Sequence, residues 1–226
     1  MNLHIRRLAA RAVALVMPCA ILAGPNSVSA SIIDTTGSAH LISAPTSVEV
    51  GALENNHRTQ VFSEQQGVTL AGNLHVDITT AGIYASPQDC TPGTLEAGMT
   101  VSSYLIHQDA IGHRGYILLH GSVTFDEAIV GVMVESDTLD ASDAILGSPD
   151  TLYPTGSAPL RHLDFPQAAD RITISQDMHT IVYDLQTQVA LDHIRILTAP
   201  ATVPGPGSLA LLVVAGLTAL SRRRRA

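Results

Sequence analysis

Short stretches in which apolar and polar residues alternate dominate the centre of this chain and restrict it to a β-rich fold. In Leu74–Ile78 the apolar side chains occupy every second position, and similar alternation recurs in Arg171–Ser175 and Thr180–Leu185. A period of two with one polar face is typical of an antiparallel sheet with one side in water. Because no long segment repeats its apolar residues at the helical period, we predict an all-β domain.

The remaining strand-like segments raise the predicted number of strands to about nine, and Gln176–His179 is short enough to close a hairpin. A short helix over Asp140–Leu146 and a long loop over Tyr153–Asp164 are also expected. The pattern favours a two-sheet antiparallel sandwich of jelly-roll type over a barrel. The other predicted strands are Ser47–Ala52, Thr59–Ser63, Val101–His107, Gly115–Phe125, Ala128–Glu135 and Leu191–Thr198.

Charge is distributed unevenly along the 226 residues. All 20 acidic residues and only five of the 12 basic residues, which are all arginines, lie between residues 31 and 203. Such an acidic body repels nucleic acid, whose binding requires a basic face, so we predict no nucleic-acid partner. Each end of the chain instead joins arginines to an apolar run, which is typical of membrane-targeting signals.

Residues 1–30 have the three parts of a secretory signal peptide. Three arginines lie in the first eleven residues, an apolar run follows over Ala12–Ala23, and a Val-Ser-Ala motif ends at Ala30. This order predicts removal by signal peptidase between Ala30 and Ser31. Cys90 is then the single cysteine of the mature chain, which excludes an internal disulfide.

The apolar run Ser208–Leu220 near the other end has 13 residues. That is about 20 Å as a helix, whereas a membrane span needs about 30 Å, so a transmembrane helix here is marginal. Four arginines follow and should hold the far end on the cytoplasmic side. A spacer, a marginal helix and a charged end are the parts of a C-terminal sorting signal that is removed by cleavage. The alternative is that the tail is not cleaved and anchors the chain in the membrane. The four arginines are Arg222, Arg223, Arg224 and Arg225.

This tail resembles the PEP-CTERM sorting signal of Gram-negative bacteria, in which a Val-Pro-Glu-Pro motif precedes an apolar run and a terminal arginine cluster. The chain matches the motif at Val203, Pro204 and Pro206 and has Gly205 where the family has glutamate. The resemblance implies export, transient membrane retention through the C-terminal helix and cleavage by an exosortase near the prolines. Delivery to the cell surface or beyond, often beside exopolysaccharide, is also implied.

The central domain is similar to a group of PEP-CTERM surface proteins of unknown function, which implies no activity. The chain therefore divides into a signal peptide (1–30), a β-sandwich ectodomain (31–199), a linker with the sorting motif (200–207) and a hydrophobic helix with its arginine tail (208–226). The similarity rests on residues 103–109, 121–132, 139–147 and 191–199.

Two groups of residues have side chains of the kinds that bind metal ions. Four acidic residues within nine positions, Glu135, Asp137, Asp140 and Asp143, are candidate calcium ligands, although their spacing does not follow the EF-hand. Alternatively, Asp137 or Asp140 caps the predicted helix.

The segment HQDAIGH at 107–113 and the later His120 offer imidazole and carboxylate ligands that suit zinc. The alternative is a hairpin with polar residues on its wet face. No nucleophile motif or phosphate-binding glycine loop is present in the sequence, so no catalytic residue is assigned.

The chain contains no tryptophan, the usual platform for a sugar ring, so a sugar-binding module that works by stacking is disfavoured, although polar or calcium-bridged binding to a polysaccharide remains open. Tyr153 is the best loop candidate for stacking. We interpret the chain as an exported surface or matrix protein with a structural or adhesive role. A ligand-binding module directed to calcium or a glycan is the first alternative, and a secreted hydrolase is the second.

Overall fold

The computed structural model describes residues 31–200, except 113–115, 157–160, 164–168 and 188–189. The described residues form mainly antiparallel β-sheet with one α-helix, α1 (Ser136–Leu146), and a 3₁₀ turn, η1 (Pro87–Asp89). The predicted all-β class is confirmed. The signal peptide, the sorting motif and the predicted C-terminal helix lie outside the described residues.

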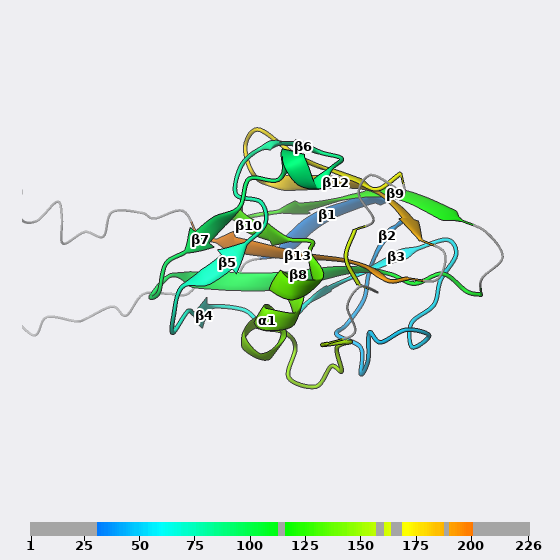
Figure 1. The fold of residues 1–226 in the computed structure, drawn as a ribbon, viewed down its shortest axis with the longest axis horizontal. Helices are drawn as coiled ribbons and strands as arrows, with labels where there is room; N and C mark the ends of the chain where they lie inside the picture. The colour runs from blue at the N-terminus through cyan, green and yellow to red at the C-terminus, as the bar shows by residue number, and fades with distance from the viewer. Residues whose placement is uncertain (1–30, 113–115, 157–160, 164–168, 188–189, 201–226) are drawn as a thin grey trace, which may run out of the picture.

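Two large sheets make up most of the described domain (Figure 1). The five-stranded sheet runs in the order β1 (Ile32–Gly37), β9 (Ile117–Phe125), β12 (Thr180–Thr187), β11 (Arg171–Ile174) and β6 (Gly82–Tyr84). The six-stranded sheet runs in the order β10 (Ala128–Met133), β13 (Asp192–Ala199), β8 (Thr100–Gln108), β3 (Thr59–Ser63) and β2 (Ala39–Leu41), with β4 (Val68–Thr69) beside β8. A separate pair consists of β5 (Leu74–Val76) and β7 (Gly93–Leu95).

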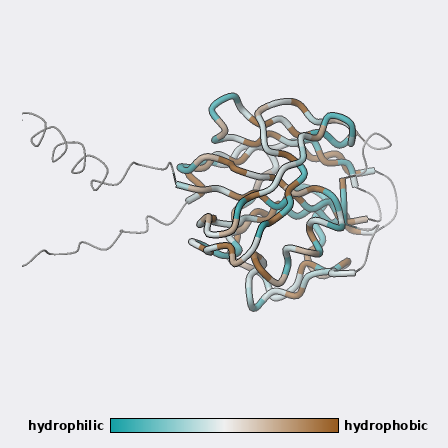
Figure 2. The backbone as a smooth tube through the Cα atoms, turned by 60° about the vertical axis from the view of Figure 1, so that its left-hand side comes forward, coloured by the Kyte–Doolittle hydropathy of each residue, from teal (hydrophilic) through white to brown (hydrophobic). Residues whose placement is uncertain are grey.

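Buried side chains from both large sheets belong to one hydrophobic cluster. Ile194 and Ile196 of β13 share it with Ile181 and Leu185 of β12. The ring centroids of Tyr104 on β8 and Phe125 on β9, which belong to different sheets, lie 4.8 Å apart. Removing each such side chain from water contributes roughly 1.5–3 kcal/mol, so this shared cluster holds the two sheets together. In Figure 2 hydrophobic stretches alternate with hydrophilic ones along the chain.

The faces of the two sheets that point away from the shared core differ. Strand β12 alternates between buried and half-buried residues, as expected for a sheet with one wet side. Strands β8 and β13 are buried on both faces from Val101 onward. Val48, Phe62 and Leu105 form a second cluster there, so the loop before β3 covers the six-stranded sheet.

Most predicted strands are confirmed, including Thr59–Ser63 and the strands on either side of the predicted hairpin. That hairpin closes through a hydrogen bond from the Met178 amide to the Ser175 carbonyl, 2.9 Å long. The predicted strand Ser47–Ala52 is wrong, because only Ser47 makes a β-bridge and the chain then turns through Gly51 at φ +80°. The helix is longer than predicted, and the strands β1, β2, β4, β6 and β7 were not predicted.

Candidate functional site

A buried ion pair joins α1 to the six-stranded sheet. Arg195 on β13 is fully buried and donates to both carboxylate oxygens of Glu64 at 2.7 and 2.8 Å. It also donates to the Ser142 hydroxyl at 2.6 Å, to the Leu139 carbonyl at 3.1 Å and to Asp143 at 3.0 Å. Because both charges are buried, removing either partner would leave the other without compensation.

A second buried arginine extends this network across the helix. Arg161, also fully buried, donates to Asp140 at 2.8 Å and to Asp143 at 2.6 and 3.1 Å. The two aspartates are three positions apart on α1 and therefore share one face of the helix. Asp143 bridges Arg161 and Arg195, so the network fixes the helix and the following loop against the sheet.

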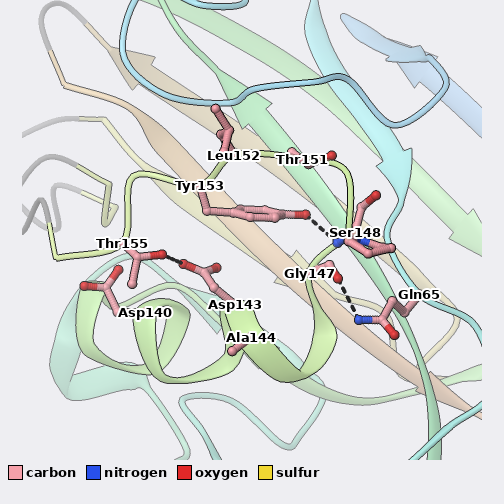
Figure 3. Close-up of a pocket in the computed structure, with 11 residues that line it drawn as sticks. Gln65, Asp140, Asp143, Ala144, Gly147, Ser148, Thr151, Leu152, Tyr153 and Thr155 are labelled. Carbon is pink, nitrogen blue, oxygen red and sulfur yellow. Dashed lines mark hydrogen bonds between the residues drawn. The ribbon is translucent and has the colours of Figure 1, made fainter.

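Asp140 and Asp143 of this network also line an open hollow of about 440 Å³ (Figure 3). The Tyr153 hydroxyl donates to Glu64 at 2.8 Å and accepts from the Ser148 amide at 2.8 Å, and the ring lies 5.4 Å from the Arg195 guanidinium carbon. Burial, together with the Glu64 carboxylate, raises the pKa of Tyr153, so this tyrosine stays neutral and acts as a structural tie. The other lining residues are Gln65, Asp140, Asp143, Ala144, Gly147, Ser148, Pro149, Thr151, Leu152 and Thr155.

The four predicted calcium ligands are divided between two hollows. Asp140 and Asp143 line the hollow of Figure 3 and are paired with Arg161. Glu135 and Asp137 line a separate hollow of about 420 Å³ at the start of α1. In the described part of the chain, no three or more His, Cys, Asp or Glu residues are grouped so that they could hold a metal. Calcium binding by this segment stays a prediction.

The start of α1 is held by a residue distant in sequence. One oxygen of the buried Asp77 accepts hydrogen bonds from the Val134 amide at 2.7 Å, from the next amide at 2.9 Å and from the Thr138 hydroxyl at 2.7 Å. Asp137 lies in the first turn and Asp140 in the body of the helix. The prediction that one of them caps the helix is therefore wrong.

The HQDAIGH segment does not form a zinc site with His120 in the described structure. His107 lies on β8 of one sheet, and His120 lies on β9 of the other. His107 is fully buried, with Nδ1 2.7 Å from Nε2 of His193. Burial lowers the pKa of His107 to about 4, and burial followed by the proximity of His107 lowers that of His193, so both rings are neutral at pH 7. His113 lies outside the described residues.

An exposed aromatic residue that the sequence analysis did not single out lies directly before β9 of the five-stranded sheet. Tyr116 is 67% exposed and Leu118 is 55% exposed. His120 contacts Asp184 at 2.7 Å on the same face of the sheet as Leu118. Tyr116, Leu118 and His120 occupy alternate positions in the sequence. Such alternation is typical of a strand with one face in water and could have identified them. A hollow of about 410 Å³ beside them is lined by Ala85, Leu118, Ala169, Asp170, Arg171 and Asp184.

The two ends of the described domain lie at one edge. Ser31 donates to Asp126 through its amide and its hydroxyl, each at 2.7 Å, and Ala199 is the register partner of Ala128. Residues 126–128 therefore link the first and last described segments. Within the described ranges, no helix is long and apolar enough to cross a membrane.

Cys90 is a free, half-buried cysteine at the margin of the shared core. Burial, and then the negative charge of Asp77, raises the pKa of its thiol to about 11. The thiolate form, which is the nucleophile, is therefore scarce at pH 7.

Comparison of the chain with protein-family models, with curated proteins and with solved structures finds no match.

Proposed function

We propose that this chain is an exported surface or extracellular-matrix protein with a structural or adhesive role, processed at both ends. Its partners are signal peptidase at Ala30–Ser31, an exosortase-like enzyme at Val203–Pro206 and exopolysaccharide outside the cell. The tail holds the chain in the membrane transiently before release to the surface. The sequence signals at the two ends support this proposal.

One structural observation carries the proposal furthest, namely the meeting of both domain ends at residues 126–128. Ser31 contacts Asp126, and Ala199 pairs with Ala128. A leader and a sorting tail attached to these ends would leave the domain from the same edge. The faces far from that edge would then stay accessible while the chain is still attached to the membrane.

We infer that the folded domain is a two-sheet sandwich of jelly-roll type. The single cluster shared by β8, β9, β12 and β13 and the antiparallel order of both sheets support this arrangement. The parallel pairing of β2 with β3 is a departure from a purely antiparallel sandwich.

Cell fractionation tests the sorting step. Wild-type protein is expected in the surface or extracellular fraction, whereas the double variant Pro204→Ala/Pro206→Ala should accumulate in the membrane with its tail attached. Pro149→Ala, a proline outside the motif, is the matched control and should behave like the wild type. Equal distribution of both variants and the wild type would contradict processing at the motif.

The exposed Tyr116 favours a glycan-directed module as a second candidate. Sugar rings stack on exposed aromatic faces, and His120, Asp184 and Arg171, on strands β9, β12 and β11 of the same sheet, supply hydrogen-bonding groups. Co-sedimentation with the host's exopolysaccharide is expected to fall at least tenfold in Tyr116→Ala and to stay unchanged in Leu152→Ala. Leu152 is a fair control because it is 63% exposed but lies by the other sheet. Equal binding by both variants would remove this candidate.

A further inference from the structure

The residue that would begin the mature chain is already held by a carboxylate. The Ser31 amide nitrogen lies 2.7 Å from Oδ1 of Asp126, and the Ser31 hydroxyl lies 2.7 Å from Oδ2. The Asp126 amide in turn donates to the Ser31 carbonyl at 3.2 Å. Three hydrogen bonds thus join this one pair of residues, which lie 95 positions apart.

Hydrolysis of the Ala30–Ser31 peptide bond changes the charge of this nitrogen. Water adds across the bond, so Ala30 leaves with a carboxylate and Ser31 gains an α-amino group. That amine has an ordinary pKa of about 7.7–8.0 and takes up a proton at neutral pH. The neutral amide beside Asp126 therefore becomes an ammonium group without any need for the chain to move.

We propose that Asp126 is the binding site for the α-ammonium group created at Ser31 by signal cleavage, so that processing itself fastens strand β1 to its sheet. This inference rests on the cleavage position in the proposed function. A hydrogen bond between two charged groups is roughly twice as strong as one between neutral groups. The new ion pair therefore adds to contacts that the uncleaved chain already makes.

The position of β1 explains why such a fastening matters. It is an edge strand that pairs with β9, beginning with Ile32 opposite Phe125. Ile32 packs against the shared core, so fraying of β1 would open that core at its edge. An edge strand that lifts away also leaves unpaired backbone groups on β9, which invites pairing with other chains.

The charges around Asp126 are compatible with this role. Burial acts to raise the pKa of Asp126, but the hydrogen bonds from the Ser31 amide and hydroxyl outweigh it and leave the pKa lowered. Glu127 follows in sequence, and burial and then Asp126 raise its pKa. His179 contacts the Phe125 carbonyl through Nδ1 at 3.0 Å. The Asp126 carboxylate therefore favours a cation at Ser31.

A double-mutant cycle tests the proposal on the chain from Ser31 to Ala226, purified in detergent. The native start is produced with a fusion partner whose removal leaves no extra residue, and the comparison chain starts at Ala30. Each is made with Asp126 and with Asp126→Asn. Titration by NMR should give the Ser31 α-amino group a pKa about half a unit to one unit above its ordinary value. In Asp126→Asn the Ser31 α-amino group should have its ordinary pKa, and in the chain that starts at Ala30 the α-amino group, now on Ala30, should also have its ordinary pKa.

Acetylation of the Ser31 amine is a control that removes the charge without changing any side chain. The acetylated chain keeps the amide donor but loses the charge, so hydrogen exchange of β1 should become faster than in the free-amine chain at pH 7. An ordinary α-amino pKa, or β1 exchange that is indifferent to acetylation, would overturn the proposal. Because the start is made without signal peptidase, either result is distinguishable from failure of export.

Discussion

The outer faces of the two large sheets differ in exposure: the face of the six-stranded sheet is covered, and that of the five-stranded sheet is open to water. On the six-stranded sheet, α1 and the flanking loops cover fully buried polar side chains, among them Arg195, His107 and Glu64. On the five-stranded sheet, the corresponding face remains in water and carries Leu118, His120 and Asp184. The covered face makes α1 part of the fold, whereas substitutions on the open face should cost the fold little. The comparison predicts that mutations of similar chemistry will have very different effects on the two sides.

The largest difference is expected between two arginines. Arg195→Ala leaves Glu64 buried without its partner and should lower the free energy of unfolding by about 3–5 kcal/mol. Arg171→Ala, on the exposed face, should change it by no more than about 0.5 kcal/mol. Urea denaturation followed by circular dichroism measures both. A loss in Arg195→Ala as small as that expected for Arg171→Ala would show that the covered network does not hold the fold.

Two leucines test the effect of burial on stability without any change of charge. Leu105 on β8 is fully buried under the loop that covers the six-stranded sheet, and Leu118 on β9 is 55% exposed. Leu105→Ala should cost about 2–5 kcal/mol through lost contacts and a cavity, and Leu118→Ala less than about 1 kcal/mol. If Leu118→Ala were as destabilising, the outer face of the five-stranded sheet would also be packed against something.

The buried histidine pair makes the covered side sensitive to acid. The pKa of His107 is lowered to about 4 in the folded chain, against about 6.5 when unfolded, and that of His193 is also lowered. Between pH 4 and pH 6.5 the unfolded state binds more protons than the folded state. The free energy of unfolding is therefore largest above pH 6.5 and decreases as the pH falls through this range. For His107 alone the loss is on the order of 3 kcal/mol.

Chemical denaturation at pH steps from 7 to 4.5 measures this loss. The variant His107→Gln/His193→Gln should show a flatter profile over the same range, although it is less stable at pH 7. A wild-type free energy of unfolding that does not change between pH 7 and 5 would contradict the neutral, buried pair.

A smaller effect is expected at the start of α1. Asp77→Ala removes the acceptor of three hydrogen bonds and should cost about 1–2 kcal/mol, with loss of helical order at Ser136–Leu146. Asp137→Ala, in the exposed first turn, should cost less than about 0.5 kcal/mol. Thermal denaturation and amide exchange of the helix distinguish them. A larger effect at Asp137 would restore the sequence-based interpretation of the cap.

The sequence predicted the open face of β12 better than the covered face of β8. Alternation in Thr180–Leu185 correctly indicated a strand with one wet face, because its polar residues do face water. The same rule indicated that His107 lies on a wet hairpin face, whereas it is fully buried and contacts His193, 86 positions away. A local pattern contains no information about what later covers a sheet.

Local sequence patterns also could not predict contacts between residues that lie far apart in the sequence. Glu64 and Arg195 are 131 positions apart, and Asp77 contacts Thr138 across 61 positions. Arg161 lies outside the acidic segment, so the local pattern did not indicate that Asp140 and Asp143 pair with an arginine. Strand β1 was missed because Asp34, Thr35 and Thr36 interrupt the alternation after Ile32 and Ile33.

The termini of the protein recovered from cells provide the most direct test of the whole account. Intact-mass and peptide mass spectrometry of surface-fraction protein should find a first residue at Ser31 and a last residue before Ser208. Recovery from the cytosol of a chain that still carries residues 1–30 and the arginines at 222–225 would contradict export and processing together.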